Sequence, residues 1–224
     1  MRNLALVCVL AAVFGLSFGC GGKDAKDKPA TAVDTAAVAP DTDTTFTDKR
    51  DGKVYRIVEI GGAVWMAENL NYAAEGSRCY GNKDANCAKY GRLYDWNTAM
   101  TACPAGTHLS SSKEWYALVN YAGGGENAGT KLKSSTGWKN DKYVPAGTNE
   151  YGFSALPGGV GSSAGHFNYA GSHGYWWSAS ELDDAYFASY QYMYYLYKHV
   201  VLYFNFKTGL YSVRCVQDSK EGEQ

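Results

Sequence analysis

The sequence has little of three features that would have indicated its function directly. Its 21 basic residues are scattered and are balanced by 22 acidic ones, whereas a nucleic-acid-binding surface needs positive charge gathered on one face. Its longest uncharged apolar run, residues 4–18, is shorter than the roughly 20 residues of a membrane-spanning helix. No internal repeat of 20–50 residues is visible. We therefore expect no nucleic-acid partner, no spanning helix and no repeat array.

The N-terminal segment has the pattern of a signal peptide. Arg2 precedes the apolar run, and small residues lie just before Cys20. This arrangement resembles the bacterial lipoprotein box, which implies a signal peptide at 1–19 and a lipid on Cys20 after cleavage. Gly21 replaces the aspartate that retains such proteins in the inner membrane, which favours the outer membrane or the cell surface. The alternative is a secreted protein that is cleaved nearby.

Composition divides the rest of the chain into three parts. Residues 20–47 consist mainly of Ala, Thr, Asp, Lys and Pro, with no aromatic residue before Phe46. Such a segment cannot bury enough apolar surface to offset its ordering entropy, so we expect a lipid-anchored, disordered tether. Residues 48–218 have the length of one domain with a sizeable core. Residues 219–224 form a charged tail.

Four cysteines follow the leader, and an even number in an exported chain predicts disulfides. Cys79, Cys87, Cys103 and Cys215 permit three pairings, of which we favour Cys79–Cys87 and Cys103–Cys215. The first pairing closes a short polar loop, and the second joins an early helix to the last strand. A zinc site is the alternative. However, the spacing of Cys79 and Cys87 is not that of a zinc ribbon, and no second close pair exists.

Two short amphipathic helices are predicted in the first half of the domain. The first has Asp95 as its N-cap and ends at Pro104. The second opens with a capping box formed by Ser111 and Glu114. Their buried faces are expected to hold Trp96, Ala99, Met100 and Cys103 in the first helix, and Trp115, Leu118 and Val119 in the second.

Short strands are predicted elsewhere in the domain. A first strand covers residues 54–60, and an apolar segment follows the Gly61-Gly62 turn. Later strands are expected at 153–156, 175–180, 185–192, 199–206 and 210–216. Residues 157–174 form a long Gly-rich loop. The predicted fold class is therefore α+β: two short helices with an antiparallel sheet of short strands, held together by disulfides.

Many short motifs in this chain resemble one bacterial family in their order and spacing. They include Trp65-Met-Ala-Glu-Asn-Leu-Asn-Tyr72, Tyr90-Gly-Arg-Leu-Tyr94, Cys103-Pro-Ala-Gly-Thr-His-Leu109, Gly152-Phe-Ser-Ala-Leu-Pro-Gly158 and Ser212-Val-Arg-Cys215. On these residues the domain is identified as a member of the Fibrobacter succinogenes major paralogous domain family. The resemblance covers residues 47–218. The departures are small, such as Ser110 where proline is usual.

The resemblance implies a variant of the C-type-lectin-like fold. In that fold a cysteine on the first helix pairs with one on the last strand, as Cys103 and Cys215 would. The loop at 157–174 would take the position of the ligand loops of lectin-like domains. The family is best known as abundant secreted or lipid-anchored surface proteins without an established biochemical activity. We therefore expect no catalytic residue and no cofactor.

Aromatic residues are the most unusual part of the composition, with 19 Tyr and 6 Trp. Tyrosine offers rigid contact area with a polar tip, which suits carbohydrate stacking and adaptable binding surfaces. Alternate residues of a strand face opposite sides, so some tyrosines at 186–197 should face outward, as should Trp176 if Trp177 is in the core. The candidate ligand-binding residues are Tyr169, Trp176, Tyr190, Tyr192 and Tyr194. The alternative is cross-strand pairing that only stabilises the sheet.

The remaining polar residues indicate structural roles. His108 has no evident nucleophile or acid partner, so a hydrogen-bonded structural histidine is predicted. The calcium-binding motifs of sugar-binding lectins are missing. Glu181, Asp183 and Asp184 could supply oxygens to a cation, but a solvated turn between two strands is the favoured interpretation. No metal site is predicted.

Together these features predict a non-enzymatic, lipid-anchored surface protein that binds or adheres to a glycan or a surface protein. Two alternatives come from other classes. One is a relative of the formylglycine-generating oxidases, which share a related fold and use two closely placed cysteines. The other is a purely structural protein of the envelope. Two free thiols would favour the oxidase, and high abundance without any ligand would favour the structural protein.

Overall fold

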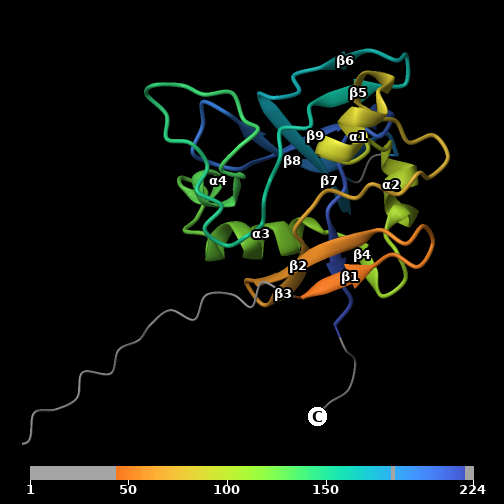
Figure 1. Cartoon of the computed structure of the whole chain (residues 1–224), viewed down its shortest axis with the longest axis horizontal. Coiled ribbons are helices and arrows are strands. Elements are labelled where there is room, and N and C mark those ends of the chain that lie inside the picture. Colours follow the sequence, from red (N-terminus) through yellow and green to blue (C-terminus); the bar gives the residue numbers. More distant parts are fainter. Residues whose placement is uncertain (1–43, 183–184, 220–224) are drawn as a thin grey trace, which may run out of the picture. The chain divides into compact units, whose positions relative to one another are not determined.

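A computed structural model describes residues 44–182 and 185–219 (Figure 1). The predicted signal peptide, Cys20 and most of the predicted tether lie outside the described residues, as do Asp183, Asp184 and residues 220–224. Within the described ranges, no helix combines the length and the apolar character needed to cross a membrane.

The largest sheet joins the first strands of the domain to the last one. Its strand order is β1-β2-β3-β11-β4, with antiparallel pairing throughout. The strands are β1 (Thr45–Thr47), β2 (Val54–Ile60), β3 (Ala63–Met66), β4 (Thr107–Leu109) and β11 (Cys215–Gln217). Strand β2 has the predicted bounds. Gly61 and Gly62 form the turn after it, with φ of 64° and 80°, a conformation that glycine adopts without strain.

The tether prediction, residues 20–47, extends too far into the chain. Thr45, Phe46 and Thr47 form β1 and pair with β2. Phe46 is partly buried and packs against the core. Backbone pairing with β2 and the contact of the Phe46 ring with the core therefore hold this segment in the domain.

The second half of the chain forms two three-stranded sheets. One has the order β7-β8-β9 and the other β10-β5-β6. Their strands are β5 (Val160–Ser162), β6 (Phe167–Asn168), β7 (His173–Glu181), β8 (Phe187–Tyr194), β9 (Val201–Phe206) and β10 (Gly209–Leu210). The predicted loop at 157–174 thus contains two short strands. The predicted strand at 210–216 is instead divided between β10 and β11.

Four α-helices are present in the described residues rather than the two predicted. They are α1 (Asp84–Tyr90), α2 (Trp96–Ala102), α3 (Ser112–Tyr121) and α4 (Ala128–Leu132), and a 3₁₀ turn at Tyr80–Asn82 precedes α1. Both predicted N-caps are confirmed: Asp95 accepts a hydrogen bond from the Thr98 amide, and Ser111 and Glu114 form the capping box. Met100 is exposed rather than buried, because α2 buries only Trp96, Ala99 and Ala102.

Both favoured disulfides are present. Cys79–Cys87 joins the segment before the 3₁₀ turn to the middle of α1, and Cys103–Cys215 joins the end of α2 to β11. The second bridge connects residues 112 positions apart in sequence. The α+β class, the antiparallel sheets and the two disulfides of the prediction are therefore features of the structure.

Strand β7 separates two hydrophobic cores. Trp177 belongs to the first core, with Tyr94 and Tyr211. Trp176 belongs to the second core, with Trp115 and Phe153. Because both faces of β7 are covered at this point, successive residues of the strand are buried on opposite sides.

Candidate functional site

One face of the β7-β8-β9 sheet carries a continuous group of aromatic rings. The strand register places His173 opposite Tyr194, Tyr175 opposite Tyr192, and Tyr190 opposite Tyr203. Paired residues and residues two apart in a strand share a face, so these side chains lie on one side of the sheet. Tyr169 joins them from the preceding loop. We define the aromatic face as Tyr169, His173, Tyr175, Tyr190, Tyr192, Tyr194 and Tyr203.

The rings of the aromatic face support one another. The His173 ring centroid lies 4.4 Å from that of Tyr194 and 4.6 Å from that of Tyr169. Tyr175 and Tyr192 are 5.2 Å apart, and Tyr192 and Tyr203 are 6.0 Å apart. Each such pair is worth about 0.5–1.5 kcal/mol beyond its area burial. Mutual packing therefore restricts the rotamers of these side chains before any ligand arrives.

The alternation of β8 explains why these rings reach the surface. Gln191 and Met193 point into the protein and are buried, whereas Tyr190, Tyr192 and Tyr194 are only partly buried. Buried Tyr211 lies against the inner end of the face, with its ring centroid 5.2 Å from that of Tyr175. Tyr169 and Tyr203 are exposed. The face therefore has a fixed base and an open surface.

The aromatic face carries no formal charge at neutral pH. Burial lowers the pKa of His173, so its imidazole is neutral at pH 7. Burial is also the main cause that raises the pKa of Tyr175, and it raises that of Tyr192 to about 12. The seven rings of the face thus offer π-surfaces and hydroxyl groups and carry no ionic group themselves, while Lys139 lies beside them over the ring of Tyr195.

The structure brings together four of the five candidate residues from the sequence: Tyr169, Tyr190, Tyr192 and Tyr194. The expectation for Trp176 is wrong, because its side chain is fully buried and its indole N–H donates a hydrogen bond to Asn69 Oδ1 at 2.8 Å. His173, Tyr175 and Tyr203 also belong to the face, although the sequence did not predict them as members. His173 and Tyr175 alternate in step with Trp177, and Tyr203 alternates in step with Asn205, which was the only sign in the sequence that they share a face. Only the strand register shows which of these rings meet.

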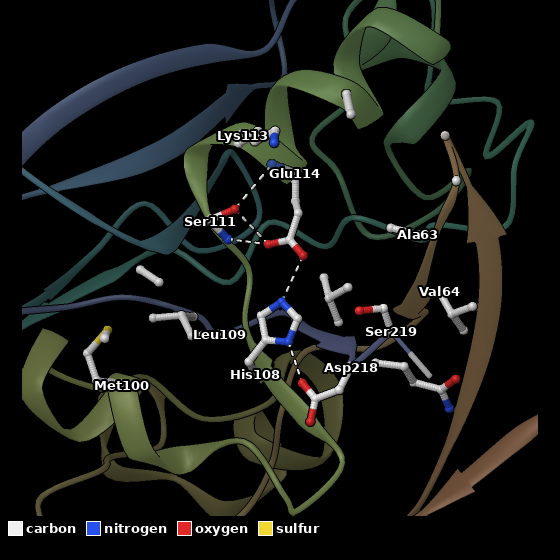
Figure 2. Close-up of a pocket in the computed structure, with 16 residues that line it drawn as sticks. Ala63, Val64, Met100, His108, Leu109, Ser111, Lys113, Glu114, Asp218 and Ser219 are labelled. Carbon is white, nitrogen blue, oxygen red and sulfur yellow. Dashed lines mark hydrogen bonds and ion pairs between the residues drawn. The ribbon is translucent and has the colours of Figure 1, made fainter. Parts of the chain in front are cut away.

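A second feature is a hollow of about 790 Å³ beside His108, lined by α3 and the ends of β3, β4 and β11 (Figure 2). Figure 2 shows the imidazole between two carboxylates. Its Nε2 lies 2.7 Å from Glu114 Oε1, and its Nδ1 lies 2.7 Å from Asp218 Oδ1. Partial burial lowers the pKa of His108, but hydrogen bonds to Asp218 and Glu114 outweigh this effect and raise it overall.

In this geometry His108 links β4 to α3 and to the segment after β11 through its two carboxylate partners. Both ring nitrogens are engaged with carboxylates, so neither is free to take a proton from a substrate or to bind a metal. The Ser111 hydroxyl is hydrogen-bonded to Glu114 Oε2 at 2.7 Å, and therefore it does not form a nucleophile–base pair with the histidine. The predicted hydrogen bonding of this histidine is confirmed, whereas the expectation that it has no acid partner is wrong, because Glu114 and Asp218 both contact its ring.

The acidic turn contributes one described carboxylate, that of Glu181, which forms an ion pair with Lys207. In the part of the chain that the structure describes, no group of three or more His, Cys, Asp or Glu side chains is arranged to hold a metal ion.

Comparisons with known proteins assign the chain to a family. No curated protein and no solved structure matches it. The family model described as the Fibrobacter succinogenes major domain matches residues 58–217. This range covers more than half of the chain and contains β7, β8 and β9, which carry the aromatic face. The chain belongs to the Fibrobacter succinogenes major domain family.

Proposed function

We propose that this protein is a non-enzymatic binding protein of the bacterial surface, and that its aromatic face stacks against the sugar rings of a neutral glycan. The aromatic face itself is the observation that carries the proposal. Seven rings meet on one side of a sheet, several of them in mutual contact and partly open to solvent.

The chemistry of the face favours a neutral sugar over an ionic ligand. Aromatic rings with hydroxyl tips can stack on the apolar faces of sugars and hydrogen-bond to their hydroxyl groups. Tyr190, Tyr192 and Tyr194 follow one another at every second position of β8, so their Cα atoms span roughly 13 Å. That length is enough to contact more than one ring of a polysaccharide chain. A phosphate-rich ligand would find no cation within the face.

The placement of the domain is part of the same proposal. The leader and Cys20 indicate a lipoprotein of the outer membrane or the cell surface, held there by a flexible tether. We also assign the domain to a variant of the C-type-lectin-like fold. The disulfide between the end of α2 and β11 supports this assignment.

A screen of the exported chain against arrays of neutral and charged glycans tests the proposal. We expect binding to be confined to neutral polysaccharides and to persist at high ionic strength, because the face is uncharged. Absence of binding to every neutral glycan would contradict the proposal. A protein retained by the same chain in a pull-down, and lost when the aromatic face is altered, would replace the glycan by a protein ligand.

The oxidase alternative has a direct test. It needs two closely placed thiols, whereas Cys79, Cys87, Cys103 and Cys215 are all joined in disulfides. This pairing supports the binding proposal. Thiol titration of the purified chain should detect no reactive thiol from these four residues. Two free thiols among them would support the oxidase instead.

A further inference from the structure

Strand β9 is an edge that lacks the usual protection against pairing with another chain. It is the outer strand of the β7-β8-β9 sheet, and no strand within the described ranges pairs with its outer edge. Its sequence, Val201-Leu-Tyr-Phe-Asn-Phe206, contains no charge, no proline and no glycine. Proteins commonly protect edges with lysine, proline or a bulge, and β9 has none of these.

The register shows which backbone groups of β9 face outward. The amide of Lys207 donates to the Tyr186 carbonyl, inside the sheet. Hydrogen-bonded positions alternate along an antiparallel ladder, so residues 205, 203 and 201 also face β8, and residues 202, 204 and 206 face away. The Phe206 amide fits this pattern, because it donates to its neighbour's side chain, Asn205 Oδ1, at 2.8 Å.

The same three residues expose their side chains. Leu202 is 41% exposed, Phe204 44% and Phe206 55%. The ring of Phe206 packs at a tilt against that of Phe187, with centroids 4.4 Å apart, which extends the apolar surface onto β8. Apolar side chains and outward-facing backbone groups therefore coincide on one edge. An extended strand from another chain would pair with the backbone groups and cover the apolar side chains at the same time.

We propose that β9 pairs with β9 of a second copy of this chain, antiparallel and about a twofold axis at Phe204. This register places Phe204 opposite the partner's Phe204, and Leu202 opposite the partner's Phe206. Roughly six N–H···O bonds form when the outward groups of the three residues exchange with those of the partner. Asn205 releases the Phe206 amide in the process.

The uncharged composition of β9 favours a second copy of the same strand over an unrelated strand. The two β9 strands meet without any like charges, since neither contains a charged residue. Lys207, the first cation beyond β9, lies opposite the partner's Val201 in this register and is already paired with Glu181. Directly opposed apolar side chains stabilise the pairing, and a twofold axis closes the assembly at a dimer.

The pairing has a consequence for binding, which rests on the proposed function. A twofold axis perpendicular to the sheet keeps each sheet face on its own side, so the two aromatic faces lie side by side. Tyr203 of β9 is the ring nearest to the shared edge. Two such faces on one surface allow a polymer to be held at two places at once, which raises its apparent affinity through effective concentration.

Cysteine cross-linking of the full chain tests the register. Paired Cα atoms at a hydrogen-bonded position lie about 5.5 Å apart, within the range of a disulfide. Phe204→Cys should therefore give a covalent dimer on mild oxidation. Leu202→Cys alone should not, because its counterpart lies about 13 Å away along the strand. A mixture of Leu202→Cys and Phe206→Cys chains should give a mixed dimer.

The controls make the outcomes decisive. The unmodified chain, oxidised in parallel, gives the background from its own cysteines. Tyr116→Cys, on the exposed side of α3, gives the rate of random collision. We expect Phe204→Cys to cross-link at least about tenfold faster than Tyr116→Cys, a difference of about 1.4 kcal/mol. Equal rates at positions 116, 202 and 204 would overturn the proposal, as would no dimer at position 204.

A non-covalent measurement checks the same pairing without an oxidant. Sedimentation of the unmodified chain should show a dimer whose dissociation constant rises at least about tenfold in Phe204→Lys, since a charge at the axis meets its own copy. Tyr116→Lys should leave it unchanged. An unmodified chain that is monomeric at every concentration would overturn the proposal. If circular dichroism shows that Phe204→Lys is unfolded, the cross-linking result decides.

Discussion

The guanidinium of Arg214 donates a hydrogen bond to Asn69 Oδ1 across 2.9 Å, at a point where both side chains are buried. The indole N–H of Trp176 donates to the same oxygen. Burial lowers the pKa of Arg214 to about 9, and its other donors reach the carbonyls of Met66, Phe153 and Ser154. One amide oxygen thus links three separate segments of the chain.

Asn69→Ala should destabilise the protein by about 3 kcal/mol or more, because it leaves a buried cation and an indole N–H without their acceptor. Asn69→Asp is the matched control. It keeps an oxygen for Arg214 and Trp176, replaces the amide that donates to Tyr90 and Ser212 by a second oxygen, and adds a negative charge that the Arg214 guanidinium partners. Urea denaturation should show a smaller loss for Asn69→Asp. Equal losses would mean that the shared oxygen is not the important group.

Removing the Cys103–Cys215 bridge should cost more than removing the Cys79–Cys87 bridge. In the chain-entropy model a loop of 112 residues is worth about 4.8 kcal/mol and a loop of 8 residues about 2.5 kcal/mol. The double Cys→Ala variants of each pair can be compared by thermal denaturation. The prediction fails if the variant lacking the short loop is the less stable of the two.

His108 should make stability decline at alkaline pH. Its folded pKa is raised above 6.5, so its contribution is complete below the unfolded pKa and is lost as pH rises through the folded value. The ion pairs are partly exposed, which limits their worth to less than about 1 kcal/mol. His108→Gln should remove this dependence in a series of denaturation curves. An unchanged pH profile would show that the contacts of His108 with Glu114 and Asp218 do not contribute to stability.

His173 should act in the opposite direction. Its folded pKa is lowered by burial, so the unfolded chain binds the proton more readily. The stabilisation is present above pH 6.5 and is lost as pH falls through the folded value. His173→Gln should make the protein less sensitive to mild acid, measured in the same denaturation series. Equal acid sensitivity in both proteins would show that protonation of His173 does not lower the stability of the folded protein.

Local signals in the sequence predicted several elements well. Asp95, Ser111 and Glu114 mark helix starts through bonds that span three residues, and the bounds of β2 follow from its own alternation. Helix α1 was missed, because its face toward the core consists only of Cys87 and Tyr90. Too few apolar residues recur there to give a helical period.

The candidate site depended on contacts that the sequence does not specify locally. The two-residue alternation of a strand correctly places Trp176 and Trp177 on opposite faces of β7. It does not indicate whether either face is exposed to water. Trp176 packs against Trp115 in the second core. Trp115 belongs to α3, a helix that is distant in sequence. Likewise, His173 joins the aromatic face only because the register sets it opposite Tyr194. Packing of a helix on the sheet decides the first case, and pairing between strands decides the second.

The affinity for a neutral polysaccharide, measured by titration calorimetry on the exported chain, tests the central claim most directly. The double variant Tyr192→Ala, Tyr194→Ala should bind at least about tenfold more weakly than the unmodified chain, a loss of about 1.4 kcal/mol. Tyr116→Ala, which removes an exposed tyrosine outside the aromatic face, should bind as the unmodified chain does. Equal affinities for all three chains would contradict the assignment of the aromatic face as the binding surface.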